Sequence, residues 1–227
     1  MSKVVWCLYD GSGIMGLPWA EAGYQVYCFN SSAADHGQYE IKMEHPLITY
    51  VDTWIDETFD PIGMGNNGRD APSIIFGFPS CTFLANSGEQ HERTEEELDE
   101  ALKNVRIVET LGNKYNVPYM IENPVGKLST KWKLPNYYFH PWEYGAHLRP
   151  EEGSFHPKMP FCDAYTKKTC IWCGNGFVMP PKNPVKEYQN WFWGWKSLGG
   201  KGQRTKQLRS LTPRGFARAV FEANRGL

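Results

Sequence analysis

The residues best equipped for chemistry stand at the ends of short apolar runs. Cys81 comes shortly after the run 73–78, behind a Pro79-Ser80 turn. An accessible thiol at such a turn can act as a nucleophile once it ionises, whereas most cysteines are buried and inert. Glu122 directly follows the apolar run 117–121. A carboxyl group beside an apolar pocket can keep its proton and act as an acid, although a surface carboxylate is the plainer interpretation.

A second group of small and polar residues follows three other runs. The turn Gly11-Ser12-Gly13 comes after the run 4–9, and small residues let a ligand approach the backbone closely. Many such turns are merely tight, so this signal is weak alone. Asn30 ends the run 25–29, where nucleotide-binding sheets place an acceptor for ribose hydroxyls. Asp52 follows the run 48–51 in the same way.

The elements that must position these residues alternate between strand and helix. A helix is expected at 17–22 with Gly23 as its C-cap, and a long one after Thr94, where Glu97 completes a capping box. Composition predicts a loop over 61–72 and a polar segment over 85–93. This alternation predicts an α/β fold with a mainly parallel sheet, whose strand ends gather Asp10 and the other polar residues at one edge.

The amino-acid composition of the chain changes after about residue 127. Residues 128–195 hold six of the nine tryptophans and no long helical pattern, which favours a smaller β-rich region. The alternation at 191–195 predicts a strand with three tryptophans on one face, for core packing or for stacking on bases. A last helix is expected from Thr212-Pro213 onward.

Composition limits the classes of protein. The chain has 227 residues, 41% of them hydrophobic, which suits one ordinary domain with a real core. No apolar run reaches the roughly 18 residues of a membrane helix, and no signal peptide is evident, so we expect a cytoplasmic protein. Net charge is -1, but residues 182–227 hold ten Lys/Arg and two acids. This balance fits an anionic partner or a solvated surface, with Lys201, Arg204 and Lys206 as candidate phosphate contacts.

Six cysteines do not indicate a disulfide scaffold in a chain of this size. Cys170 and Cys173 form a Cys-x-x-Cys-Gly turn, with Cys162 and His156 upstream as further zinc ligands. A second Cys-x-x-Cys pair is absent from the sequence, so we expect no metal, with this zinc site as the weaker alternative.

Together the motifs resemble the DNA (cytosine-5) methyltransferase family, in its short phage-type form. The matching segments, in order, are 8–13 with 18–19 and 21–24, then 77–82, 121–129, 140–145, 165–172 and 209–213. Each motif is weak alone, but their order and the 41 residues from Cys81 to Glu122 make the resemblance fairly specific.

The resemblance implies a Rossmann-like S-adenosylmethionine-dependent methyltransferase fold with helices on both faces of the sheet. It implies methyl transfer from S-adenosyl-L-methionine to C5 of a flipped cytosine in DNA, with a covalent bond between Cys81 and C6. Glu122 would assist at N3 and Asn123 would position it. The implied cofactor residues are Tyr9, Asp10, Gly11, Ser12, Gly13, Asn30, Asp52 and Pro79. The implied substrate residues are Ser80, Thr82, Lys167, Lys168 and Thr169.

The expected division is a cofactor-binding and catalytic core over 1–127, a substrate-side lobe over 128–208 and a C-terminal helix over 209–227 that returns to the core. With so short a lobe, we expect DNA as partner with little sequence specificity, and no obligate protein partner.

Two departures from the family pattern lie on the cofactor side. Cys7 and Asn30 stand where the family carries carboxylates. One alternative is therefore C5 modification of cytosine, in DNA or as a nucleotide, with a different, possibly carboxylated, donor. A second alternative is a non-catalytic nucleic-acid-binding remnant of the fold.

Overall fold

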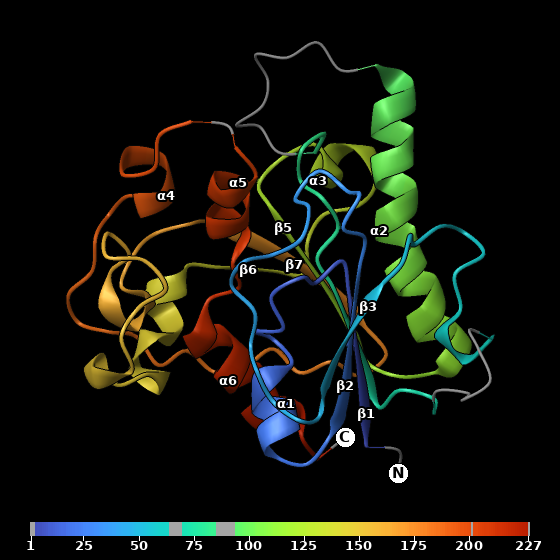
Figure 1. The fold of residues 1–227 in the computed structure, drawn as a ribbon, viewed down its shortest axis with the longest axis horizontal. Coiled ribbons are helices and arrows are strands. Elements are labelled where there is room, and N and C mark those ends of the chain that lie inside the picture. Colours follow the sequence, from blue (N-terminus) through green and yellow to red (C-terminus); the bar gives the residue numbers. More distant parts are fainter. Residues whose placement is uncertain (1–2, 64–69, 85–93, 201, 227) are drawn as a thin grey trace.

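A seven-stranded sheet forms the centre of the protein, in a computed structural model that describes residues 3–63, 70–84, 94–200 and 202–226. The strand order is β3-β2-β1-β4-β5-β7-β6, with β1 to β5 parallel and β7 antiparallel to both neighbours (Figure 1). The strands are β1 Val4–Leu8, β2 Gln25–Asn30, β3 Ile48–Asp52, β4 Ile74–Gly77, β5 Tyr119–Pro124, β6 Tyr137–Phe139 and β7 Thr169–Gly174.

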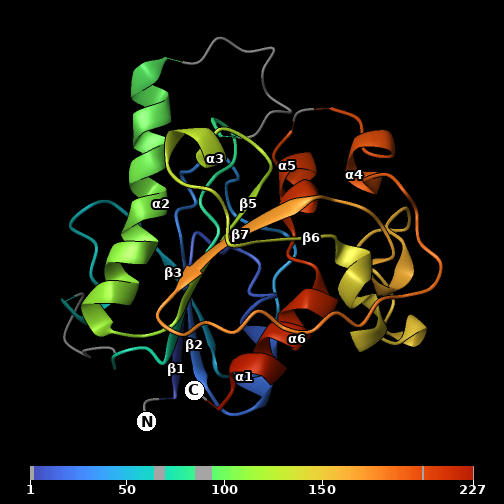
Figure 2. The same ribbon diagram turned by 180° about the vertical axis from the view of Figure 1, so that it is seen from behind.

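Helix α2 (Glu95–Tyr115) covers one face of the sheet, as Figures 1 and 2 show. The expected capping box begins it: Glu97 N–H donates to Thr94 Oγ1 (3.2 Å), and Thr94 N–H donates to the Glu97 carboxylate (3.0 Å). Its apolar side, spaced by the helical period, packs on β1, β4 and β5. A Cβ on Gly77 would overlap Val108, so the glycine lets helix and strand approach closely.

Helices α1 (Leu17–Glu21) and α6 (Arg214–Asn224) cover the opposite face. Trp19 and Phe221 meet edge to face across this layer, with ring centroids 5.2 Å apart. Gly23 follows α1 with φ of 86°, as a helix-ending glycine does. The last expected helix is confirmed, and it returns to the core. The Rossmann-like α/β prediction is therefore confirmed, with helices on both faces of a mainly parallel sheet.

The expected β-rich character of 128–208 is wrong. Its two strands, β6 and β7, extend the central sheet instead of forming a sheet of their own. The remainder consists of loops and short helical turns, because a proline-rich segment supports few regular elements. Those turns are α3 Leu128–Lys131, three 3-10 helices at Pro141–His147, Pro150–Glu152 and Phe161–Asp163, α4 Trp193–Lys196 and α5 Gln203–Ser210. The boundaries at 127 and 208 stay a prediction.

The strand expected at 191–195 is also wrong, since α4 begins at Trp193. Alternate residues of a helix point roughly in opposite directions, so Trp193 and Trp195 do not share one face, and Trp191 lies before the helix. Trp193 is 1% exposed in the core, whereas Trp195 is 62% exposed. The expected loop at 61–72 begins with a 3-10 turn, Pro61–Gly63, and residues 64–69 and 85–93 lie outside the described residues. No helix in the described part combines the length and apolar composition that crossing a bilayer requires.

Candidate active site

Cys81 lies just beyond the carboxyl end of β4, in the middle of the sheet. The chain leaves the strand through Phe78, whose N–H donates to the Leu8 carbonyl (3.0 Å), and turns at the buried Pro79. The thiol is half-buried. Burial raises the pKa of Cys81, the nearby Lys167 ammonium lowers it and the Glu122 carboxyl raises it. The resting group is therefore a thiol that needs a change in its surroundings to ionise.

Glu122 lies on the neighbouring parallel strand, directly after Ile121, which pairs with Gly77 of β4. Because both strands run in the same direction, Glu122 and Cys81 reach the same edge of the sheet. Burial raises the pKa of Glu122, and Lys167 opposes that rise. The carboxyl therefore holds its proton to higher pH than an ordinary glutamate, as a proton donor must.

Lys167 brings a positive charge to these two groups from the segment before β7. Its Nζ donates to the Arg209 carbonyl (3.1 Å) and lies 5.6 Å from the centroid of the Phe192 ring. These contacts hold the ammonium where it lowers the pKa of both Cys81 and Glu122. A thiol, a carboxyl and an ammonium group thus act on one another in a half-buried site.

Asn123 joins the segment of Glu122 to the segment of Cys81. The side chain is buried, and its Nδ2 donates to the Pro79 carbonyl (2.8 Å). Its Oδ1 is buried and has no hydrogen-bond partner among the described residues. The contact fits the positioning role that the sequence analysis gave this residue.

The predicted substrate residues separate into two groups. Ser80 and Thr82 bond to each other beside the thiol, with their hydroxyl oxygens 3.1 Å apart. Lys168 is exposed. Thr169 is buried, and its hydroxyl donates to the Lys167 carbonyl (3.0 Å), which fixes the start of β7. The structure therefore gives Thr169 a local structural contact, whereas Ser80, Thr82 and Lys167 surround Cys81.

The glycine turn after β1 is organised by Asp10. Its Oδ1 accepts from the Ser12 N–H (2.8 Å), the Ser12 hydroxyl (2.9 Å) and the Gly13 N–H (2.9 Å). These amides are therefore occupied and cannot cradle a phosphate, as such turns do in nucleotide-binding proteins. The buried Asp10 Oδ2 has no partner among the described residues. Burial raises the pKa of Asp10, although the three hydrogen bonds oppose this. A cationic group of a ligand fits this carboxylate oxygen better than an anion does.

Two tyrosines cover the glycine turn. A Cβ on Gly11 would overlap the Tyr39 ring, and one on Gly13, where φ is 71°, would overlap the Tyr50 hydroxyl. The Tyr50 hydroxyl lies 3.0 Å from the Ser12 carbonyl and 2.9 Å from the Met43 carbonyl. Because Gly11 and Gly13 have no side chains, the rings of Tyr39 and Tyr50 can pack directly on the turn.

Asn30 and Asp52 lie side by side, because they are register partners at the ends of β2 and β3. Asp52 accepts from the Ser32 N–H (2.9 Å) and hydroxyl (2.6 Å). The Asn30 amide donates to the Ser31 carbonyl (3.3 Å). Both fit the predicted ribose and adenine side of a cofactor site. Tyr9 differs, since its hydroxyl donates to the Asn104 carbonyl on α2 (3.2 Å) and its side chain packs with that helix layer.

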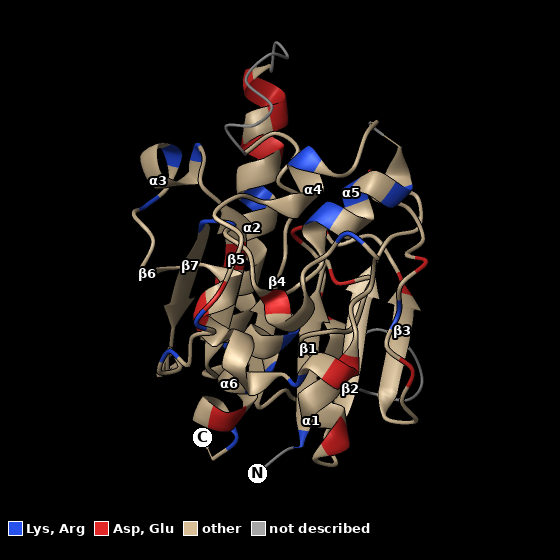
Figure 3. Ribbon diagram, turned by 90° about the vertical axis from the view of Figure 1, so that its left-hand side faces the viewer, with Lys and Arg blue, Asp and Glu red and all other residues tan. Residues whose placement is uncertain are grey.

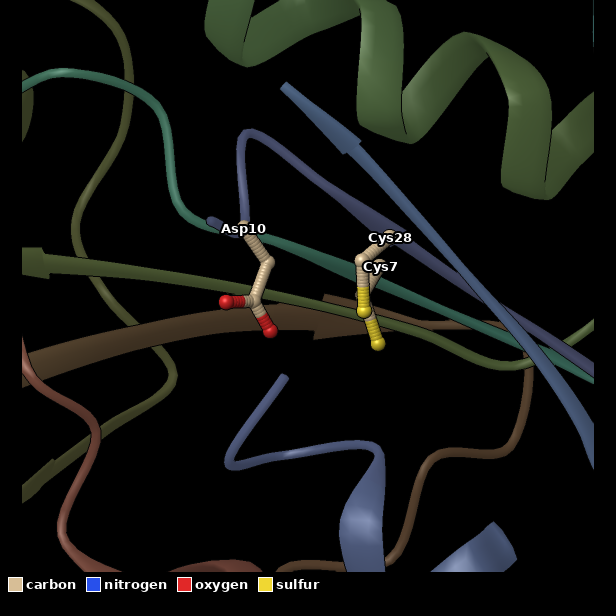
Figure 4. A group of neighbouring side chains, drawn as sticks. All are labelled: Cys7, Asp10 and Cys28. Atoms are coloured by element: carbon tan, nitrogen blue, oxygen red, sulfur yellow. The ribbon is translucent and has the colours of Figure 1, made fainter. Parts of the chain in front are cut away.

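Cys7, Asp10 and Cys28 form a buried group beneath the turn (Figure 4). The two cysteines are register partners on β1 and β2, and one ligand atom from each residue lies within 4.8 Å of the others. Structural zinc sites use four ligands, and this group offers three in an apolar core. Burial raises the pKa of Cys7, which favours neutral core thiols.

The alternative zinc site is not assembled. Cys170 and Cys173 are three residues apart on β7 and so point to opposite faces of the sheet, one into each core layer. Cys162 Sγ lies 3.6 Å from the Leu148 carbonyl, and His156 stacks on Trp193. The Cys-x-x-Cys spacing suggested a zinc-binding turn, but these residues form a β-strand instead.

Four hydrogen bonds that the sequence does not predict hold the segment 31–47 over this site. The Tyr39 hydroxyl lies 2.9 Å from the Ser210 hydroxyl of α5. Gln207 of α5 donates to the His36 and Gln38 carbonyls (2.7 and 2.8 Å). Asp35 accepts from the Thr82 hydroxyl (2.7 Å), one residue from the thiol. The segment has no periodic pattern, so no sequence signal places it here.

No protein-family profile and none of the curated proteins matches the chain. Among solved structures, it is similar to a protein provisionally described as a DNA modification methyltransferase encoded within an E. coli prophage, with TM-score 0.44, 13% identity, and coverage of 75% of this chain and 45% of that one. It is also similar to the CcbJ methyltransferase from Streptomyces caelestis, with TM-score 0.26, 16% identity, and coverage of 60% and 48%. The chain thus spans less than half the length of each.

Proposed function

We propose that the protein transfers a methyl group from S-adenosyl-L-methionine to C5 of cytosine in DNA, through a covalent bond between Cys81 and C6. One observation carries the proposal: Cys81 and Glu122, from the adjacent parallel strands β4 and β5, lie close to Lys167 from the segment before β7, and both charges change the pKa of the thiol. A thiol with a neighbouring proton donor is the pair that addition to a pyrimidine ring requires.

In the proposed reaction, the Cys81 thiolate forms a bond to C6, and the electron pair of the C5–C6 double bond moves to C5. Glu122 donates its proton to N3 and so neutralises the charge that spreads through the ring. When bound, the cofactor supplies an electrophilic methyl group. After C5 gains that methyl group, with S-adenosylhomocysteine as the other product, C5 loses its proton to a base. N3 then returns its proton to the Glu122 carboxylate as the C5–C6 double bond reforms and the Cys81 thiolate leaves.

The residues of the glycine turn fit such a cofactor. The unpartnered Asp10 Oδ2 suits a cationic group such as the amino group of the methionine portion, and Asn30 and Asp52 offer acceptors for ribose and adenine. The occupied amides of Ser12 and Gly13 count against a cofactor held by its phosphates.

The test is intact mass spectrometry of the protein after reaction with DNA that carries 5-fluorocytosine. Fluorine at C5 blocks the final elimination, so a functioning Cys81 stays attached to the DNA. We expect an adduct whose mass includes one methyl group, only when S-adenosylmethionine is present. Cys81→Ser should abolish it and Cys162→Ser, at another half-buried thiol, should not. The absence of adduct on duplex and single-stranded DNA alike would overturn the proposal.

One observation favours a carboxylated donor as a second candidate. Lys42 Nζ lies 4.8 Å from the ring centroid of Tyr50, the tyrosine that covers Gly13, so a cation stands beside the turn. With Asn30 uncharged, an anionic donor would meet less repulsion here than beside a carboxylate. Calorimetric titration decides between the two donors. If S-adenosylmethionine binds more tightly than its carboxylated analogue, and Lys42→Gln leaves both affinities unchanged, the second candidate is wrong.

A further inference from the structure

Five exposed side chains combine aromatic rings with lysines near the candidate active site. Trp191, Trp195 and Tyr138 are 40%, 62% and 45% exposed. Lys196 Nζ lies 4.7 Å from the Trp191 ring centroid, and Lys168 Nζ lies 4.6 Å from that of Tyr138. We call these five residues the aromatic–lysine surface. Exposed apolar side chains that gather in a patch mark an interaction surface, whereas those that are scattered singly need no explanation.

Both parts of this surface connect to the catalytic groups. On one side, Lys167 contacts the Phe192 ring, which meets the exposed Trp195 edge to face at 5.5 Å. On the other side, Tyr138 pairs with Cys170 on β7, and Cys170 pairs with Asn123 on β5, so these three residues share the face of the sheet that α2 covers. Two strand spacings, roughly 10 Å, therefore separate the Tyr138 and Asn123 backbones. Glu122 pairs with Ile171 and lies on the opposite face, the face of Phe192.

The described cations of α5 are already engaged in contacts within the chain. Arg204 pairs with Glu40 (3.5 Å), Lys206 pairs with Asp35, and Arg209 donates to the Gly194 and Leu198 carbonyls. The expected phosphate contacts Arg204 and Lys206 are thus engaged within the chain, and Lys201 lies outside the described residues.

The lysines of the surface, by contrast, face solvent. Within the described residues, neither Lys168 nor Lys196 forms an ion pair, and both are exposed. Figure 3 shows basic positions of α3, α4 and α5 gathered beyond the carboxyl ends of the strands, the end at which Cys81 lies. An anionic chain that passes this end would meet the lysines and the aromatic rings together.

We propose that the aromatic–lysine surface binds single-stranded DNA on either side of the target cytosine, by stacking of unpaired bases on Trp195, Trp191 and Tyr138 with phosphates at Lys196 and Lys168. This inference rests on the proposed function. Rings and cations that alternate along a surface are how proteins hold single strands with little sequence preference. Paired bases in a duplex hide their faces inside the stack, so these rings would find no partner there.

The described elements around the site also favour a single strand. Helix α4 has four residues and α5 has eight, with the cations of α5 already engaged. Reading of a duplex usually places a longer helix or a β-ribbon in the major groove. The surface therefore suits a substrate whose cytosine is already unpaired.

The test is fluorescence anisotropy of a labelled 20-nucleotide oligonucleotide, single-stranded or annealed, with the inert Cys81→Ser protein so that no reaction intervenes. We expect binding of the single strand at least tenfold tighter than of the duplex. Trp195→Ala and Tyr138→Ala should each weaken single-strand binding by about tenfold. Trp54→Ala, an equally exposed tryptophan (60%) beyond β3 at the other edge of the sheet, is the matched control and should change it less than twofold.

The outcomes separate this inference from the proposed function. If the protein binds the duplex as tightly as the single strand or more tightly, and Trp195→Ala does not change this binding, the proposed single-strand surface is wrong. This holds whether or not the wild-type protein forms the 5-fluorocytosine adduct. Preferential single-strand binding that depends on Trp195, without any adduct, would support the surface and count against the proposed reaction. Preferential binding together with faster adduct formation on the single strand would support both.

Discussion

The amide of Asn123 donates from Nδ2 to the carbonyl of Pro79 at 2.8 Å, and this bond joins the loop of the candidate nucleophile to the strand of the candidate acid. Asn123 follows Glu122, and Pro79 stands two residues before Cys81. Since the bond is buried, it is not weakened by competition with water. The separation between thiol and carboxyl therefore depends on the hydrogen bond made by the residue that follows Glu122.

Asn123→Ala should slow the reaction without preventing folding. Loss of the bond lets the nucleophile loop shift, and a misplacement of about 1 Å costs roughly 100-fold in rate. The rate of adduct formation on 5-fluorocytosine DNA measures this, together with DNA affinity, which should change less than threefold. Asn136→Ala is the control, because Asn136 Oδ1 accepts from the Cys173 N–H (2.9 Å), and the register partner of Cys173 on β5 is Met120, three residues before Asn123. An equal loss of rate in both variants would reduce Asn123 to a general stabilising role.

The reactivity of Cys81 should respond in opposite directions to the removal of its two charged neighbours. Lys167 lowers the pKa of the thiol and Glu122 raises it. At pH 8, Lys167→Gln should therefore slow alkylation of Cys81 by iodoacetamide, and Glu122→Gln should accelerate it, each by a fewfold to tenfold. Peptide mass mapping follows Cys81 separately from the other thiols.

The pH profile of the same alkylation supplies the second readout. Because burial is the largest influence and raises the pKa of Cys81, wild-type reactivity should climb at higher pH than that of a free cysteine. The Lys167→Gln profile should move further to high pH and the Glu122→Gln profile to low pH. Profiles that coincide in all three proteins would show that these charges do not reach the thiol.

The positions of the strand-end residues could be predicted because parallel strands end at a common edge. The runs before Asp10, Asn30, Asp52, Cys81 and Glu122 were each recognisable as strands. The structure places four of these residues at or beyond a strand end, whereas Glu122 lies within β5, two residues before its end. Their roles remain predictions. The long helix was equally predictable, since a capping box and a regular apolar spacing agree there.

The elements that failed prediction are those in which tertiary contacts outweigh local pattern. Strand β6 has three residues, too few to show an alternation of apolar and polar side chains. It joins the sheet by pairing with β7. At 191–195, alternate tryptophans fit a strand, but Trp193 enters the core beside Tyr165 and the chain turns as α4. Tyr39 lies in an irregular segment held by α5, so its position over Gly11 depends on contacts between residues 167 to 171 positions apart in the sequence.

Asp163 should make stability fall as pH rises from about 4 to 6. Its buried carboxylate accepts from the Gly215 N–H (2.9 Å) at the start of α6, and burial raises the pKa to about 6. The folded state then keeps a proton that the unfolded chain, with an ordinary pKa of 3.8, releases. The difference corresponds to about 3 kcal/mol.

Asp163→Asn tests this prediction, because an amide oxygen still accepts from Gly215 but does not titrate. Urea unfolding at pH 4, 5, 6 and 7 should show the variant gaining stability relative to wild type as pH rises, with a plateau above pH 6. A free-energy difference that stays constant from pH 4 to 7 would mean that Asp163 titrates normally in the folded protein.

Gly11→Ala should reveal how tightly Tyr39 covers the glycine turn. The Cβ would overlap the Tyr39 ring, so the ring must move, at a cost of about 1–3 kcal/mol of unfolding free energy. In a Tyr39→Ala background the same substitution should cost less than about 0.5 kcal/mol, because the obstructing ring is gone. Gly199→Ala is the control, since a Cβ there meets nothing within 4 Å and φ is not positive.

Urea unfolding of the four proteins in this cycle gives the coupling energy directly. A coupling above about 1 kcal/mol would establish that the ring rests on the turn in solution. It would also make Tyr39 a determinant of access to the Asp10 side of the site, because a ligand that touches the Gly11 backbone must displace or adjoin this ring. Additive effects would mean that the ring leaves the turn readily, and cofactor affinity should then be the same in wild type and Tyr39→Ala.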